Sequence, residues 1–235
     1  TPFEREWRIL RAVGHPHVVT LLDWPREQGP IPFFVMELLA GRTLDHWLDH
    51  LAGRGEGREV SLVAGVTILK QLASGLSAVH EAGIIHRDIK PENIFVCAED
   101  PPSVKLLDFG LARVAESQIT GTGVLVGTPS YVAPEQITGD LLDARADVYA
   151  LGLVMYRLLT GHHPFASDDQ VVTLGHQLLS PPPPLSWLRE EIPPSLEALI
   201  LGMLRKKPDD RPRSMLEVEL AAADVELAGE LTRGA

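Results

Sequence analysis

Four side chains that could carry out phosphoryl chemistry stand close together in the middle of the sequence. The run from His86 to Asn93 reads HRDIKPEN, and a DFG triplet begins at Asp108. The Asp88 carboxylate can accept a hydroxyl proton, and the Lys90 ammonium can neutralise a phosphate. The oxygens of Asn93 and Asp108 are hard ligands, which suit Mg²⁺ better than a soft metal. These residue types, in this order, predict transfer of a phosphoryl group.

These motifs, with an APE triplet at 133–135, resemble the signature of eukaryotic-like serine/threonine protein kinases of the bacterial type. The resemblance covers nearly the whole chain and implies transfer of the ATP γ-phosphate to serine or threonine hydroxyls of protein substrates. Asp88 would orient the acceptor hydroxyl, while Asn93 and Asp108 would hold two Mg²⁺ ions across the phosphates. Lys90 at this position is typical of serine/threonine rather than tyrosine kinases. ATP and Mg²⁺ are therefore the expected cofactors.

The resemblance also implies where the nucleotide binds. Met36 would lie at the back of the adenine pocket, and Phe95 would form its floor. The backbone of Glu37 and Leu39 would bond the adenine edge. Glu6, in a stretch that resembles the family's helix αC, would pair with a strand lysine. No Gly-rich loop and no V-A-I-K strand precede it in this sequence, so we expect these residues alone to have weak or no activity.

Residues 108–135 resemble the family's activation segment. Arg87 would pair with a phosphate carried by that segment and so order it. Thr120 and Thr122 resemble threonines that bacterial members autophosphorylate, and Thr128 resembles a threonine that hydrogen-bonds near the catalytic aspartate. The pattern predicts regulation by phosphorylation, for which a dimer acting in trans is one arrangement.

Five further residues would support the site without taking part in the chemistry. Glu135 would form a buried ion pair with Arg211. Asp147 would hydrogen-bond the backbone of the catalytic loop. His86 and Phe109 would stack in a spine that links the two lobes.

The spacing of apolar residues predicts a mainly helical chain with a few short strands. Apolar residues recur at helical spacing from Leu62 to Val79, with Ser61 as the cap and Gly83 as the end, which predicts a long amphipathic helix. Residues 148–160 are apolar on all sides and predict a buried core helix. The other predicted helices cover 3–13 and 44–51, and the predicted strands cover 18–24, 31–36, 84–85, 94–96 and 104–107.

The expected fold class is therefore α+β, with a protein-kinase-like fold. Residues 1–38 would be the remnant of the N-lobe and hinge, containing helix αC and two strands. Residues 39–235 would be a complete, mainly helical C-lobe.

Composition narrows the classes of function. The formal net charge of -11 argues against nucleic-acid binding, which requires a basic surface. The single cysteine, Cys97, rules out an internal disulfide and favours a reducing cytoplasm. The apolar stretch 148–160 contains Arg157 and is too short for a bilayer, which takes about 20 residues. We expect no membrane segment in this chain, although an anchor outside it is compatible with the pattern.

Two other functions fit parts of the sequence. A pseudokinase scaffold would keep the fold and bind partners without phosphoryl transfer, but such proteins usually alter the residues that are intact here. His46 and His50, one helical turn apart, approach the inverted zinc-peptidase pattern, but aspartate replaces its glutamate and no third ligand is evident. Two further patterns have simpler interpretations: residues 53–57 as a flexible linker and Pro181 to Pro184 as a rigid connection.

Overall fold

The computed structural model describes residues 11–23, 33, 35–53, 60–108, 129–229 and 231. Most of the predicted helix 3–13 and of the predicted flexible linker 53–57 lies outside these residues. The predicted site residues that also lie outside them are Glu6, Phe109, Thr120, Thr122 and Thr128.

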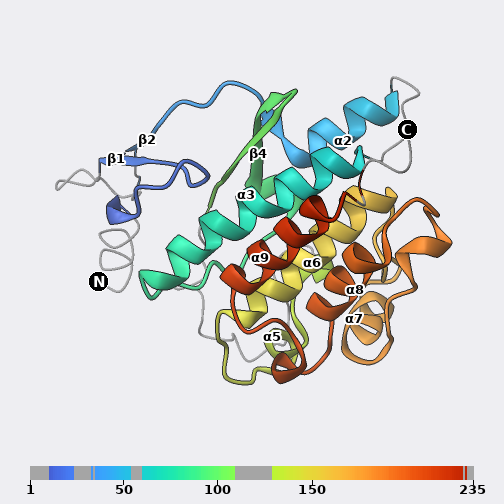
Figure 1. The fold of residues 1–235 in the computed structure, drawn as a ribbon. Helices are drawn as coiled ribbons and strands as arrows, with labels where there is room; N and C mark the ends of the chain where they lie inside the picture. Colours follow the sequence, from blue (N-terminus) through green and yellow to red (C-terminus); the bar gives the residue numbers. More distant parts are fainter. Residues whose placement is uncertain are drawn as a thin grey trace.

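Helix α6 (Arg145–Thr160) is the centre of the core. All of its residues except Arg145 and Arg157 are buried. Helices α3 (Leu62–Glu81) and α8 (Pro194–Met203) pack against it, as Figure 1 shows. A helix that is apolar all round is stable only when other elements cover every side, which confirms the core helix predicted over 148–160.

Helix α3 also follows its predicted boundaries. The Ser61 hydroxyl accepts a hydrogen bond from the Ala64 N–H at 3.2 Å, which satisfies one of the free donors at the helix start. Gly83, with φ of 78°, turns the chain after the helix ends. Helix α9 (Met215–Leu227) lies alongside α3 in Figure 1. The apolar residues predicted to face the core are all buried: Leu62, Val66, Leu69, Leu72, Leu76 and Val79.

Two small antiparallel sheets flank the helices. Strands β4 (Ile94–Glu99) and β5 (Pro102–Leu106) form a hairpin, and β3 (Arg42–Thr43) pairs with the other edge of β4. Strands β1 (Leu21–Asp23) and β2 (Val35–Met36) form the second sheet. The segment before β1 bonds to β5: the Leu106 N–H donates to the His17 carbonyl at 2.9 Å, and the Leu106 carbonyl accepts from the Val19 N–H at 3.0 Å.

The strand predicted over 84–85 is wrong, because this segment is irregular. Ile84 N–H donates to the Val79 carbonyl at the end of α3, at 3.2 Å. After Ile85, the N–H groups of His86 and Arg87 donate to the carboxylate of Asp147. Since a turn and a side chain satisfy these donors, no ladder with a partner strand forms.

The remaining elements are short and mainly helical. A mixed helical and sheet structure of this kind agrees with the predicted α+β class. The other elements are α2 (Leu44–Gly53), α5 (Pro134–Thr138), α7 (Gln170–Leu179), and the 3₁₀ turns η1 (Pro91–Asn93), η2 (Pro129–Tyr131), η3 (Leu185–Trp187) and η4 (Pro208–Asp210).

Within the described part of the chain, only α3 is long and apolar enough to cross a membrane, and over half of its most apolar window is buried inside the fold.

Candidate active site

The predicted catalytic loop connects α3 to β4, and its backbone is held by Asp147 from the first turn of α6. The two carboxylate oxygens of Asp147 accept from successive N–H groups, those of His86 and Arg87, each at 2.8 Å. The His80 ring lies 2.7 Å from the same carboxylate. Because Asp147 is only 1% exposed, this anchor lies inside the core rather than in solvent. The contact predicted for Asp147 is therefore present.

Two residues of the site have a left-handed backbone, with φ of 66° at Arg87 and 42° at Asp108. A residue with a side chain adopts this conformation at a cost of about 1–3 kcal/mol, so the surrounding structure must hold it in place. At Arg87 the carbonyl accepts from the Gln136 side chain at 3.2 Å, and the N–H is bonded to Asp147. Such strain is concentrated at functional sites.

The structure brings Asp88, Lys90 and Asn93 together. Lys90 Nζ and Asn93 Nδ2 both donate to Asp88 Oδ2 at 2.8 Å, and Asn93 Nδ2 also donates to the Asp88 carbonyl. The carboxylate remains partly accessible, with 22% of the side chain exposed. Asn93 uses its amino group in these contacts, so its carbonyl oxygen is the end available to a cation.

Asp108 lies just beyond β5 with an exposed side chain. The preceding residue, Leu107, ties this segment to the catalytic loop: its N–H donates to the Asn93 carbonyl and its own carbonyl accepts from His86 Nε2, both at 2.8 Å. The two motifs are thus fixed together through the backbone. The available donors, a carboxylate and an amide oxygen, fit Mg²⁺.

His86 is fully buried between these segments. Burial lowers the pKa of the His86 ring, although the nearby Asp147 and the Leu107 carbonyl raise it. The neutral ring donates from Nε2 to Leu107, and Nδ1 lies 3.4 Å from the Asp88 N–H. A spine with Phe109 falls outside the described residues.

The residues predicted to bind adenine lie along β2, the segment after it, and β4. Met36 is 40% exposed at the end of β2, and Phe95 is half-buried on β4. The Glu37 side chain accepts from the Thr20 N–H and Lys105 Nζ, both at 2.7 Å. Burial alone would raise the pKa of Glu37, but these hydrogen bonds hold that pKa below its usual value. Among the described residues, neither the Glu37 carbonyl nor the Leu39 N–H has a hydrogen-bond partner, so both can bond a ligand edge.

The predicted ion pair between Glu135 and Arg211 is present and buried. Sequence reasoning missed a second network, in which Arg157 contacts Tyr131 and Asp45. The signal for it was visible, because a charged residue within a buried helix requires partners. Neither partner could be identified from spacing.

The zinc hypothesis gains no support from the structure. His46 and His50 are exposed on α2. In the described ranges, no group of three histidine, cysteine or carboxylate side chains could hold a metal ion.

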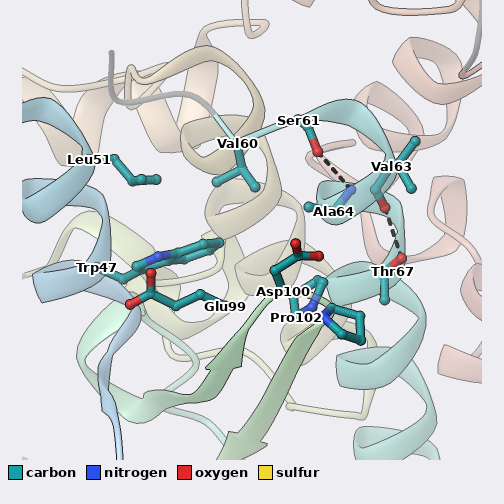
Figure 2. A pocket seen from close by; sticks show the side chains of 11 residues that line it. Trp47, Leu51, Val60, Ser61, Val63, Ala64, Thr67, Glu99, Asp100 and Pro102 are labelled. Atoms are coloured by element: carbon teal, nitrogen blue, oxygen red, sulfur yellow. Dashed lines mark hydrogen bonds between the residues drawn. The ribbon is translucent and has the colours of Figure 1, made fainter. Parts of the chain in front are cut away.

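Figure 2 shows a pocket formed by α2, the start of α3 and the β4–β5 turn. Trp47 lines one side, while Glu99 and Asp100 bring two carboxyl groups. None of the catalytic-loop residues lines it.

A family model described as the protein kinase domain matches residues 1–219. The chain belongs to the protein kinase family. Among curated relatives, the serine/threonine-protein kinase Pkn1 of Myxococcus xanthus is 40% identical over 229 residues, covering 93% of this chain and 32% of Pkn1. The serine/threonine-protein kinase PknL of Mycobacterium tuberculosis is 37% identical over 231 residues, covering 98% of this chain and 55% of PknL.

Solved kinase structures agree with this assignment. The crystal structure of Rad53 1–466 in complex with AMP-PNP superposes with a TM-score of 0.75 at 27% identity, covering 92% of this chain and 53% of that one. The fold is therefore that of a protein kinase. This chain spans between about a third and about half of the length of the relatives it matches.

Proposed function

We propose that the protein containing this chain is a bacterial serine/threonine protein kinase that transfers the γ-phosphate of ATP to hydroxyl groups of other proteins. The observation that carries the proposal is the cluster of Asp88, Lys90 and Asn93 on a loop whose backbone is anchored by Asp147. The relatives named serine/threonine-protein kinases support the same reaction class.

Each residue of the cluster has a distinct role in this proposal. Asp88 receives the hydrogen bond of the acceptor hydroxyl and takes its proton as the phosphoryl group is transferred. Lys90, 2.8 Å from the same carboxylate, is close enough to neutralise charge on the phosphoryl group. Asn93 and Asp108 would hold Mg²⁺, which supplies positive charge to the phosphates when bound. The protein contributes positioning and electrostatic stabilisation rather than a covalent intermediate.

The adenine would lie against Met36 and Phe95 and bond the backbone at Glu37 and Leu39. The neighbour Rad53 was crystallised with AMP-PNP, an ATP analogue, which supports ATP as the nucleotide. Glu6 would pair with a lysine on a strand before this chain. The division into an N-lobe portion, residues 1–38, and a C-lobe, residues 39–235, follows from the same assignment.

Regulation by phosphorylation is part of the proposal. A phosphate on Thr120 or Thr122 would pair with Arg87, and Thr128 would contact the catalytic loop. Phosphorylation in trans within a dimer would supply it. The catalytic domain would lie in the cytoplasm, where ATP and protein substrates meet it.

The test is the intact mass of the full-length protein before and after incubation with Mg-ATP. The wild type should gain phosphate, Asp88→Asn should gain none, and Asp224→Asn, an exposed carboxylate change on α9, should behave as wild type. A folded wild type that gains no phosphate and phosphorylates no protein substrate would favour the pseudokinase scaffold instead.

A further inference from the structure

Arg157 joins three separate elements of the lobe. It lies near the end of α6, the buried central helix, and its side chain is 23% exposed. One guanidinium nitrogen donates to the Tyr131 hydroxyl at 3.0 Å, and another donates to Asp45 Oδ1 at 2.9 Å. A planar guanidinium can bond two partners in fixed directions, which a lysine ammonium cannot do as well.

One end of this bridge is the segment that follows residues 109–128. Tyr131 is buried in η2, and its ring meets the His163 ring edge-on at 5.2 Å. The Ser130 carbonyl accepts from His163 Nε2 at 2.7 Å and from the Gln177 side chain. Residues 130–131 are therefore fastened to α6, to the loop after it and to α7.

The other end of the bridge is α2. Asp45 lies in its first turn, directly after β3 and the segment predicted to bond adenine. The Asp45 side chain is 27% exposed, so the ion pair is partly shielded from water. Arg157 thus connects the nucleotide side of the lobe to Tyr131.

The chain just after Tyr131 is bonded to the catalytic loop, because the Gln136 side chain donates to the Arg87 carbonyl at 3.2 Å. Burial raises the pKa of Tyr131 to about 12, and the carboxylates of Asp45 and of Glu92, in η1, add to the effect while Arg157 opposes it. An acceptor hydroxyl that approaches Asp88 must pass beside this loop. The chain that carries residues 130–131 is therefore joined to the loop at which the acceptor of a protein substrate would be placed.

We propose that Arg157 is a positioning residue that sets the spacing between α2 and the segment 130–131, and thereby the acceptor side of the kinase site. The inference rests on the proposed phosphotransfer. Helix α6 carries both anchors: Asp147 holds the catalytic loop, and Arg157 lies about 15 Å further along the axis at about 1.5 Å per residue. One rigid helix would then relate the proton acceptor to the acceptor-binding side.

The test is a charge exchange in the full-length kinase, with myelin basic protein as acceptor and kcat and KM measured separately for acceptor and ATP. Asp45→Arg and Arg157→Asp should each lower kcat/KM for the acceptor by on the order of tenfold, with KM for ATP unchanged. The double variant Asp45→Arg/Arg157→Asp restores an ion pair between α2 and α6 with reversed charges. It should recover to within about threefold of wild type.

Milder variants keep the test decisive if a charge reversal prevents folding. Arg157→Lys keeps the charge but cannot hydrogen-bond both partners in fixed directions, and Asp45→Asn keeps the shape but not the charge. Both variants should raise the KM for the acceptor, while their melting temperatures stay close to that of the wild type. Two results would overturn the positioning role. One is a loss of activity in each variant that matches its loss of folded protein, and the other is a double variant no more active than the less active single variant. A folded wild type without phosphotransfer would overturn the proposed function itself, and this result is recognised before any variant is compared.

Discussion

The guanidinium of Arg211 binds both carboxylate oxygens of Glu135, at 2.6 and 2.7 Å, across 76 residues of sequence. Its other donors are also used, by the carbonyls of Arg205 at 2.7 Å, Lys206 at 2.8 Å and Arg145 at 2.9 Å. All five N–H groups of this arginine are thus satisfied inside the core. The pair fixes the start of α5, and with it the end of the predicted activation segment, to the loop between α8 and α9.

Removing one partner of this pair should be costly. Glu135→Gln leaves a buried guanidinium without its counter-charge, and we expect a loss of about 3–5 kcal/mol in the free energy of unfolding. The matched control is Glu226→Gln, which breaks the exposed pair with Lys70 and should cost less than about 1 kcal/mol. Urea unfolding of both variants measures the difference, and equal losses would contradict the argument.

Gly41 precedes β3 at a point where the backbone leaves no room for a side chain. Its φ is 138°, and a Cβ there would lie 2.0 Å from the Val96 carbonyl oxygen. Gly41→Ala should therefore destabilise the fold by on the order of 3 kcal/mol, since backbone must move. Gly175→Ala, in the middle of α7 with open space around it, should instead stabilise by about 0.5–1 kcal/mol. Opposite shifts in melting temperature are expected, and a shift of the same sign in both variants would refute the contrast.

His163 should make the stability of the lobe depend on pH. Burial lowers its pKa from 6.5 to about 4, with Arg157 adding to the effect and the hydrogen bond to the Ser130 carbonyl opposing it. The neutral ring also accepts from the Phe165 N–H at 3.2 Å, a bond that protonation would break. Because the folded-state pKa is depressed, this contribution is fully present above pH 6.5 and is lost as the pH falls toward 4. At about 1.4 kcal/mol per pKa unit the change is about 3.5 kcal/mol.

His163→Gln removes the titrating ring but keeps an amide donor for the Ser130 carbonyl. The difference between the wild-type and variant unfolding curves, measured between pH 7 and 4, isolates the His163 term from other titrating groups. The variant should lose less stability on acidification than the wild type. Parallel curves would show that His163 does not titrate in this way.

Asp147→Asn should affect activity more than stability. The amide offers one acceptor where the carboxylate offered two, so one of the N–H groups of His86 and Arg87 loses its partner at a cost of about 1–3 kcal/mol. The left-handed Arg87 is then held less firmly, and a small displacement of the loop can lower kcat by on the order of 100-fold. Steady-state kinetics at a temperature where the variant is fully folded tests this.

The control for Asp147→Asn is Asp143→Asn, at a half-exposed carboxylate paired with Arg145 just before α6. It should change both kcat and stability little. If the two variants lose activity equally, the backbone anchor is not the reason for the effect.

The sequence predicted those features whose signal is local. The apolar spacing from Leu62 to Val79 was sufficient for α3, because a periodic face must be buried. The resemblance pointed to Asp147 and to the pairing of Glu135 with Arg211, since motif positions carry over without knowledge of the fold.

Features that depend on packing between distant segments could not be predicted. Ile84 and Ile85 have strand-forming side chains, yet the backbone there is committed to α3 and, through the next residues, to Asp147. The contacts of Arg157 require α2, α6 and η2 to be placed together first. No spacing in the chain indicates that juxtaposition.

The pairing of α3 with α9 has a consequence for the synthesis of the protein. Over a hundred residues separate the end of α3 from the start of α9, roughly 7 to 27 s of translation at about 5–20 residues per second. During that interval the nascent lobe carries a 20-residue apolar helix with one long face uncovered. Transiently exposed apolar surface makes a partly folded chain prone to aggregation, and the face of α3 that packs on α9 stays open to it until α9 has been made.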